Sequence, residues 1–357
     1  DLMNDYFFKL NDDDNVALAR RTLKKGEAGV LSTIPSGHKI ASMKINEGEA
    51  IIKYGQPIGY AKHAIKTGEH LHTHNVVYQD VDRTYSFSTR LNKPFSSITK
   101  SDFFGFKRSD GRVGTRNTIA ILTSVNCSAT VVKKIADKIN NNLILKEYKN
   151  IDGAVCLKHS TGCGMNNSGH GMNIFNQTIE GFKKHPNFVK VFVIGLGCEC
   201  AQISLYKDQE DSVSYMNIQE SGGTKNIIAM VNSQIIEMLP DLNKEERQKI
   251  PISELTVALQ CGGSDSYSGI TANPSLGIAS DLIVKHGGST ILSETPEIYG
   301  AEHLLIERAR NIEIVEKLKK QIEWWKNYTK INESSLDNNP SPGNKRGGLT
   351  TILEKSL

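Results

Sequence analysis

Residues 152–164 read Asp-Gly-Ala-Val-Cys-Leu-Lys-His-Ser-Thr-Gly-Cys-Gly. The short apolar run at 154–157 is typical of a buried strand, and it ends in a glycine-bounded turn that carries His159 and Cys163. Ligands of open α/β sheets bind outside the carboxyl ends of the strands. The stretch therefore predicts a strand of such a sheet, followed by a loop at the functional edge.

The pattern of an apolar run followed by a cysteine recurs three times. The runs at 119–122, 191–194 and 255–259 lead to Cys127, Cys198 and Cys261. We therefore expect the four thiols of this pattern to gather at one edge of a single sheet.

Segments with helical spacing alternate with these runs and with a further apolar run at 289–292. They cover residues 129–139, 172–182, 224–238 with a continuation through the charged residues near 244–249, about 271–286, and 302–328. Alternation of this kind is typical of parallel βαβ units. We therefore expect an α/β region with mainly parallel sheets over residues 103–357.

The amino-terminal part shows a different pattern. Between residues 15 and 75, short apolar pieces alternate with closely spaced glycines, which leaves no room for long helices. This predicts a small β-domain over residues 1–77. Residues 78–102 are rich in Ser, Thr and Asp without a sustained apolar period, and we expect a linker there.

The β-domain closes on His70-Leu-His-Thr-His-Asn75. Residues two apart share a face of a strand, so the three imidazoles are expected to point the same way. Such a group can hold a metal ion or a substrate carboxylate, and a polar strand end in solvent is the alternative. We expect His72 and His74 to reach the active site as solvent-facing side chains, in a cleft between domains.

Glycines flank Cys163, Cys198 and Cys261, as they do where backbone approaches another group closely. We expect these thiols, with Cys127, to bind a metal or to take part in catalysis. His159 lies four residues before Cys163 and is a candidate general base, because imidazole titrates near neutral pH. The alternatives are a small buried side chain for each cysteine and a turn-bonded ring for His159.

Arg112 and Arg116 lie in the loop before the first strand of the α/β region, and either can grip a carboxylate bidentately. Because they precede the strand, we expect them at the end opposite the cysteines. Surface arginines in a glycine turn are the alternative.

Composition limits the functions to be considered. The 357 residues carry a formal net charge of +4 without a Lys/Arg block, which argues against a nucleic-acid partner. No apolar run approaches the roughly 20 residues of a membrane helix, and residues 1–10 lack a signal-peptide pattern. Neither a phosphate-binding Gly-x-x-x-x-Gly-Lys-Ser/Thr motif nor a Cys-x-x-Cys pair occurs. Six cysteines are few for a disulfide scaffold in a chain of this length, and the positions of four of them after predicted strands indicate reduced thiols and a cytoplasmic location.

Seven motifs are spread over positions 37 to 345. They read Gly37-His-Lys39, Ile52-Lys-Tyr-Gly-Gln-Pro-Ile-Gly59, His70-Leu-His-Thr-His-Asn75, Asp110-Gly-Arg-Val-Gly-Thr-Arg-Asn117, Gly195-Leu-Gly-Cys-Glu199, Cys261-Gly-Gly-Ser-Asp265 and Asn339-Pro-Ser-Pro-Gly-Asn-Lys345. Together they resemble the altronate/galactarate dehydratase family over nearly the whole chain. The His-rich motif and Gly300-Ala-Glu-His303 are similar to the altronate branch, since the galactarate branch lacks the His-rich end.

The resemblance implies a small amino-terminal β-clip domain of the SAF type, joined to a larger α/β catalytic region. It also implies an iron-dependent hydro-lyase that acts on a sugar acid. Family members continue well past Leu357, so we expect a further carboxyl-terminal part. On these motifs we assign catalysis to His159, His72 and His74, substrate binding to Lys53, Arg116, Ser264 and Asp265, and metal binding to Cys127, Cys163, Cys198 and Cys261.

The resemblance implies that D-altronate loses water to form 2-keto-3-deoxy-D-gluconate. Divalent iron can bind the carboxylate and a hydroxyl as a Lewis acid. Thiolates suit iron or an iron–sulfur cluster, imidazoles suit a mononuclear Fe2+, and the sequence leaves both open. We expect a cytoplasmic homodimer whose partner is a small sugar acid, with no nucleic acid or membrane. The alternatives are dehydration of galactarate or a related sugar acid, and an iron or thiol redox or ligand-binding module without elimination activity.

Overall fold

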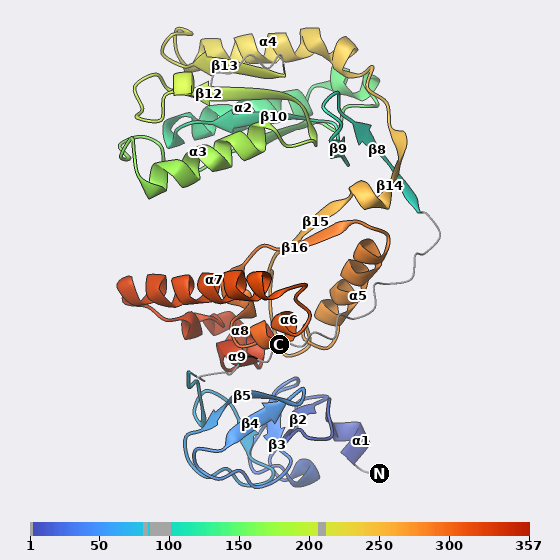
Figure 1. Ribbon diagram of the computed structural model, residues 1–357, viewed down its shortest axis with the longest axis vertical. Coiled ribbons are helices and arrows are strands. Elements are labelled where there is room, and N and C mark those ends of the chain that lie inside the picture. The colour runs from blue at the N-terminus through green and yellow to red at the C-terminus, as the bar shows by residue number, and fades with distance from the viewer. Residues whose placement is uncertain (1–2, 81–84, 86–100, 206–211) are drawn as a thin grey trace. The chain divides into compact units, whose positions relative to one another are not determined.

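The computed structural model describes residues 3–80, 85, 101–205 and 212–357 (Figure 1). The chain divides into two compact units. The first unit joins Asp1–Ile98 to Thr256–Leu357, and the second unit consists of Thr99–Leu255. The amino-terminal β-domain therefore belongs to the same unit as residues 256–357.

Two short antiparallel sheets form the β-domain. In pairing order, the first sheet contains β1 (Phe7–Phe8), β2 (Val16–Ala19), β3 (Lys39–Ala41) and β6 (His70–Leu71), and the second contains β4 (Ala50–Lys53), β5 (Gln56–Ala61) and β7 (Val76–Val77). Short α1 (Met3–Tyr6) precedes them. Aliphatic side chains of both sheets meet in one core, in which Val16, Ile51 and Ile58 are at most 1% exposed. The prediction of a small β-domain is confirmed.

The rest of the first unit is mainly helical. Its helices are α5 (Ala272–Lys285), α6 (Glu302–Ile306), α7 (Ile312–Ile331), α8 (Pro342–Arg346) and α9 (Ile352–Ser356). The helix expected over 302–328 is interrupted between α6 and α7, because the Asn311 side chain accepts a hydrogen bond from the amide of Ile314 and starts a new helix there. The only strands described in this part, β15 (Thr256–Leu259) and β16 (Ser289–Leu292), pair in parallel.

The second unit contains a four-stranded parallel sheet in the order β11-β10-β12-β13. Its strands are β10 (Thr118–Thr123), β11 (Ala154–Leu157), β12 (Phe188–Gly195) and β13 (Val213–Asn217), and its helices are α2 (Ala129–Asn140), α3 (His170–Lys183) and α4 (Thr224–Leu242). The α/β region with parallel sheets is confirmed. A separate antiparallel sheet consists of β8 (Asp102–Lys107), β9 (Val113–Gly114) and β14 (Gln248–Pro251). The predicted continuation of α4 through 244–249 is wrong, because β14 pairs with β8 there.

Short 3-10 helices complete the described secondary structure. They lie at Glu27–Gly29, Asn126–Ser128, Leu143–Glu147, Ile203–Leu205, Ile252–Glu254, Thr295–Ile298 and Leu336–Asn338. In the described part of the chain, no helix combines the length and apolar character that a membrane crossing requires.

Both faces of the parallel sheet are covered. On β10, Ile119 and Ile121 pack into the core formed with α2 and α4, whereas Ala120 and Leu122 pack into a core on the opposite face. All four side chains are at most 1% exposed. This two-sided burial explains why the strand reads as a continuous apolar run rather than an alternating one.

The strand order places a reversal point beside β10. The connection through α2 leads to β11 on one side of β10, and the connection through α3 returns to β12 on its other side. Ligands of such sheets bind outside the carboxyl ends at this point. Cys127, Cys163 and Cys198 follow β10, β11 and β12 respectively. The prediction that Cys261 follows a strand of the same sheet is wrong, because β15 pairs with β16 in the first unit.

Candidate active site

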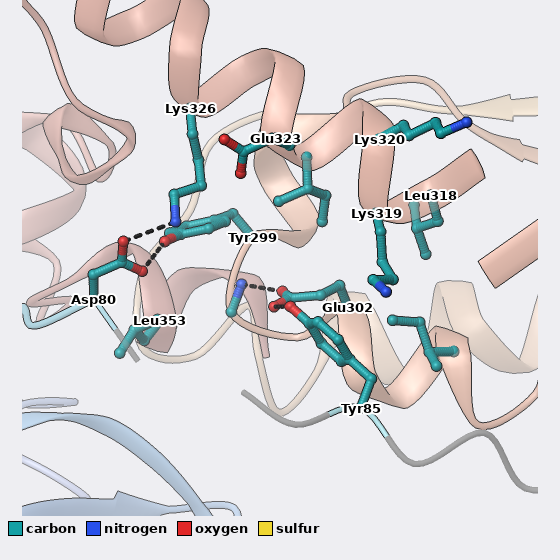
Figure 2. Close-up of a pocket in the computed structure, with 13 residues that line it drawn as sticks. Asp80, Tyr85, Tyr299, Glu302, Leu318, Lys319, Lys320, Glu323, Lys326 and Leu353 are labelled. Atoms are coloured by element: carbon teal, nitrogen blue, oxygen red, sulfur yellow. Dashed lines mark hydrogen bonds and ion pairs between the residues drawn. The ribbon is translucent and has the colours of Figure 1, made fainter. Parts of the chain in front are cut away.

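One cavity of the first unit, of about 360 Å³, contains none of the residues that the sequence assigns to catalysis, substrate binding or metal binding, although Gly300 and Glu302 of the Gly300–His303 motif line it (Figure 2). In it, Asp80 accepts hydrogen bonds from the Tyr299 hydroxyl at 2.6 Å and from the Lys326 ammonium at 2.8 Å. The Tyr85 hydroxyl donates to Glu302 at 2.7 Å. No His or Cys is among the described lining residues. Its acids are paired, and the contacts of Asp80 and Tyr85 anchor the segment that follows the β-domain.

The histidines after β6 gather at a different place in the first unit. The strand ends at Leu71, and the chain turns at Asn75, whose side chain accepts from the His72 amide and donates to the His70 carbonyl, both at 2.9 Å. The prediction of one strand face for His70, His72 and His74 is therefore wrong. The turn nevertheless brings the ring centroids of His72 and His74 within 5.7 Å and 5.6 Å of the His70 ring.

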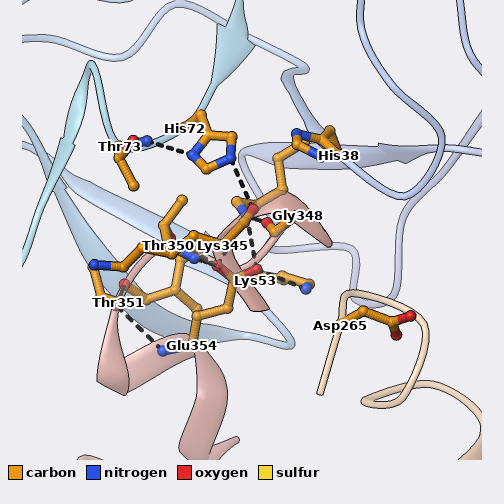
Figure 3. A network of polar contacts seen from close by, with 12 residues as sticks. His38, Lys53, His72, Thr73, Asp265, Lys345, Gly348, Thr350, Thr351 and Glu354 are labelled. Atoms are coloured by element: carbon orange, nitrogen blue, oxygen red, sulfur yellow. Dashed lines mark hydrogen bonds and ion pairs between the residues drawn. The ribbon is translucent and has the colours of Figure 1, made fainter. Parts of the chain in front are cut away.

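Two imidazoles of the β-domain bind backbone carbonyls at the carboxyl end of α8 (Figure 3). His38 Nε2 donates to the Arg346 carbonyl at 3.0 Å, and His72 Nε2 donates to the Lys345 carbonyl at 2.9 Å. His72 Nδ1 accepts from the Thr73 amide at 2.7 Å, so both of its ring nitrogens have partners. The expected solvent-facing position of His72 is wrong, since its half-buried ring holds this backbone in place.

A buried set of three ions lies beside these contacts. Glu354 of α9 receives Lys39 Nζ at 2.8 Å and Lys53 Nζ at 2.9 Å, and none of the three side chains is more than 1% exposed. Lys39 also donates to the Gly348 carbonyl at 2.5 Å. Burial alone would raise the pKa of Glu354, but the two ammonium groups outweigh it and lower this pKa to about 2. The carboxylate is therefore charged and its surroundings keep a surplus of positive charge.

The histidines beside this positive set are neutral. Burial, followed by the neighbouring histidines and Lys39, lowers the pKa of His70 to about 3. Burial and the charge of Lys39 likewise lower the pKa of His72 to about 4. Neutral imidazole can accept a proton or a hydrogen bond from a hydroxyl, and it can bind a metal.

The loop after β15 also meets this region. Asn344 donates to the Ser264 carbonyl at 2.7 Å, and the Ser266 amide donates to the Gly347 carbonyl at 3.0 Å. Asp265 accepts from the amides of Tyr267 and Ser268 at 2.9 and 2.8 Å, which fixes its carboxylate within the turn. The predicted substrate ligands Lys53, Ser264 and Asp265 therefore lie on segments that converge, while their role in binding stays a prediction.

Cys261 lies in a cavity of about 310 Å³ in the first unit. Its sulfur and the carboxylates of Glu294 and Glu297 form the only group of three potential metal ligands that lie within 4.8 Å of one another among the described residues. The ammonium of Lys355 contacts the same sulfur at 3.2 Å and pairs with Glu297. A positive group therefore already occupies this cluster.

The other three predicted thiol ligands share the second unit. The loops that carry them are joined by backbone hydrogen bonds, from Asn126 to Thr161 at 2.8 Å and from Cys200 to Cys163 at 3.0 Å. Loss of solvation, then the neighbouring thiols of Cys163 and Cys198, raise the pKa of Cys127. The three exposed thiols are thus neighbours at the carboxyl edge of the sheet. Convergence of Cys261 with them stays a prediction.

The remaining predicted residues also lie in the second unit. His159 Nε2 donates to the Thr123 carbonyl at 2.9 Å and its Nδ1 accepts from the Thr161 amide at 3.2 Å, so a role as base would require release of a hydrogen bond. Arg116 precedes β10, opposite the thiols, and lies 3.8 Å from a carboxylate oxygen of Asp152. The catalytic role of His159 and the binding role of Arg116 stay predictions.

Residues that the sequence assignments omitted hold the first-unit site together. They are His38, Lys39, His70, Lys345, Arg346 and Glu354. Four of them, His38, Lys39, His70 and Lys345, belong to the quoted motifs, and Arg346 adjoins the last motif, so the motifs were an available signal. Glu354 carried no such signal, because its significance depends on two lysines from distant strands.

The structure combines a mixed α/β fold, a small amino-terminal β-domain and a cluster of neutral imidazoles and cations. Family models match residues 5–79 (Altronate/galactarate dehydratase SAF domain), 105–243 (D-galactarate dehydratase/Altronate hydrolase, second domain) and 252–357 (D-galactarate/Altronate dehydratase, C-terminal). The chain belongs to the altronate/galactarate dehydratase family, and it is a dehydratase of sugar acids.

Three characterised relatives align along nearly the whole chain. Altronate dehydratase of Bacillus subtilis (strain 168) is 37% identical over 98% of this chain and 72% of its own length. Galactarate dehydratase (L-threo-forming) of Escherichia coli (strain K12) is 36% identical over 99% of this chain and 71% of its own length. Altronate dehydratase of the same E. coli strain is 35% identical over 98% of this chain and 72% of its own length.

Replacing Glu354 by Gln leaves two buried ammonium groups without a counter-charge. We expect a loss of about 3–5 kcal/mol in the free energy of unfolding at neutral pH. The folded-state pKa of Glu354, about 2, lies below the roughly 4.3 of an unfolded Glu. The stabilisation is therefore complete above pH 4.3 and is lost as the pH falls toward 2. Urea denaturation from pH 7 to pH 3 measures it, with exposed Glu47→Gln as the control. Equal stability of Glu354→Gln and wild type at pH 7 would contradict the expectation.

Gly162 and Gly164 flank Cys163 but differ in their tolerance of a side chain. Gly162 has φ +100°, and an added Cβ would lie 2.4 Å from the Ser124 carbonyl, whereas nothing lies within 4 Å of a Cβ at Gly164. We expect Gly162→Ala to destabilise the second unit by roughly 1–3 kcal/mol, and Gly164→Ala to have little effect. Thermal melts of the pair test this, and equal melting temperatures would refute it.

Proposed function

We propose that this sugar-acid dehydratase acts on D-altronate and forms 2-keto-3-deoxy-D-gluconate. Identities of 37, 36 and 35% do not separate the altronate from the galactarate relatives. The observation that supports altronate is the imidazole group of His38, His70, His72 and His74, whose last three members come from the His-rich motif that resembles the altronate branch.

The reaction needs a proton acceptor for C2, a route for the C3 hydroxyl to leave, and a grip on the carboxylate. Neutral imidazoles near Lys39 supply acceptors in a positive field. The exposed Arg346 guanidinium beside them has no hydrogen bond or ion pair with any described residue, and it suits bidentate binding of a carboxylate. The enol that follows loss of water then tautomerises to the 2-keto acid.

The proposal includes iron, for which the two units offer different donor sets. Cys127, Cys163 and Cys198 give three neighbouring soft thiols, which suit iron or an iron–sulfur cluster. Cys261 with two carboxylates suits a mononuclear ion, but Lys355 occupies that group and would have to move. Bound iron would supply Lewis-acid polarisation of substrate oxygens.

The proposal also includes a homodimer in the reducing environment of the cytoplasm. All six cysteines are free and five are exposed, which fits reduced thiols. Light scattering on the reduced protein reports the mass of the assembly.

Substrate assignment is tested with reduced, iron-supplemented protein offered D-altronate and galactarate in parallel. We expect 2-keto-3-deoxy-D-gluconate from D-altronate with a kcat/KM at least tenfold above that for galactarate. Preferential turnover of galactarate would assign the chain to the rival substrate. Redox titration without turnover of any sugar acid would instead support a redox or binding module.

Metal removal tests the iron proposal. We expect a chelator to abolish turnover and Fe2+ to restore it, because the elimination depends on polarised substrate oxygens. Cys127→Ser, Cys163→Ser and Cys198→Ser should each lower the iron content per chain and the visible absorption of reconstituted protein. Cys156→Ala, within β11, is the matched control and should retain both. Wild-type iron content in all three serine variants would exclude this donor set.

A further inference from the structure

Hydrogen bonding assigns the protons of the His38 ring. The Arg346 carbonyl can only accept, so the 3.0 Å contact requires a proton on His38 Nε2. Burial lowers the pKa of His38, which favours the neutral ring. A neutral ring with its proton on Nε2 has a lone pair on Nδ1. His38 therefore presents an acceptor on the side that faces His70.

The hydrogen bond between His38 and His70 likewise assigns the protons of the His70 ring. Its Nε2 lies 3.0 Å from His38 Nδ1, so it must be the donor in that contact. His70 is then neutral with its proton on Nε2 and a lone pair on Nδ1. The two hydrogen bonds, from His38 to the Arg346 carbonyl and from His70 to His38, thus fix both the tautomer and the ring orientation of His70. A hydrogen-bond partner on the second ring nitrogen commonly does the same for a catalytic histidine.

Nδ1 of His70 accepts no hydrogen bond from any described residue, although its ring is held in place. His72 and His159 differ, because both of their ring nitrogens are bonded to backbone. His74 is exposed, and no described residue makes a hydrogen bond that would orient its ring, which lies 5.6 Å from that of His70. Half-buried His70 therefore combines a fixed ring with an available lone pair.

We propose that His70 is the general base that removes the C2 proton of the sugar acid, and that His38 is its positioning residue. The inference rests on the proposed location of the active site at this imidazole group. The C2–H bond breaks, its electron pair forms the C2–C3 double bond, and the C3–O bond breaks. His70 Nδ1 takes the proton, and protonation of the leaving hydroxyl gives water. No net oxidation or reduction occurs.

The charges around His70 suit a base that also releases its proton. Burial and the facing groups His38, His72, His74 and Lys39 keep the pKa of the free ring low, at about 3. A bound carboxylate adds negative charge beside the ring and raises this pKa toward the range in which a base is effective. Once the proton is on His70, the positive charge of Lys39 favours transfer of this proton to the leaving hydroxyl.

The first test reads the tautomer directly. Wild-type protein carrying ¹⁵N-histidine is examined by long-range ¹H–¹⁵N NMR between pH 5 and 8, with the His70 signals assigned by their loss in His70→Gln. We expect a protonated Nε2 and an unprotonated Nδ1 throughout. The opposite tautomer, or a doubly protonated ring at pH 6, would overturn the proposal whatever the substrate proves to be.

The second test measures turnover of the sugar acid that wild type dehydrates best. We expect His70→Gln to lower kcat by about 10²–10⁴-fold, the usual contribution of a general base, with KM changed less than threefold. His38→Ala should lower kcat less, and His38→Gln should restore part of it, because its amide can donate to Arg346 and accept from His70. His63→Ala, an exposed histidine of the same β-domain, is the control.

The outcomes separate this inference from the proposed function. Absence of wild-type turnover with every sugar acid would refute the proposed function, while the NMR result would still report on His70. A folded His70→Gln variant that keeps kcat within fivefold of wild type would refute the assignment of His70 as the general base. If His70→Gln melts at a much lower temperature, the comparison of His38→Gln with His38→Ala decides. An equal loss of kcat in both His38 variants would refute the proposal that His38 positions His70 as the base.

Discussion

The buried carboxylate of Glu354 is the constraint on which the first unit depends. An ionised group with no exposed surface is tolerated only when paired, and Lys39 and Lys53 supply that pairing from the two sheets of the β-domain. The residues lie far apart in sequence, 315 positions between Lys39 and Glu354. Their contact therefore ties the β-domain to α9, while the carbonyls of the last two residues of α8 bind His38 and His72.

In the second unit, loop geometry brings three thiols close together while leaving them exposed. Both faces of its sheet are covered by apolar side chains, and the thiols lie in the loops beyond the carboxyl ends of the strands. Backbone hydrogen bonds join the loops after β10, β11 and β12. The positions of Cys127, Cys163 and Cys198 thus follow from strand order and loop geometry rather than from packing of the thiols themselves.

The first unit places charged lysines next to neutral imidazoles, and this arrangement suits an acid substrate. Positive charge is concentrated on lysines that are paired and buried, while the imidazoles next to them are held neutral by burial and by that charge. Neutral rings remain available to exchange protons, and the positive surplus favours binding of a carboxylate. A sugar acid undergoing loss of water requires both properties in one place.

The sequence by itself determined the local elements, because periodicity and glycine spacing act over a few residues. It predicted the β-domain, the strands before Cys127, Cys163 and Cys198, and most helices. Tertiary structure decided the rest: β15 pairs with β16 in another sheet, Asn75 turns the chain after Leu71, and Glu354 meets two lysines. The physical reason is that each outcome depends on a partner distant in sequence or on a side chain that competes with the strand for backbone hydrogen bonds. The proton positions on His38 and His70 likewise depend on one backbone carbonyl, that of Arg346, which no local pattern reveals.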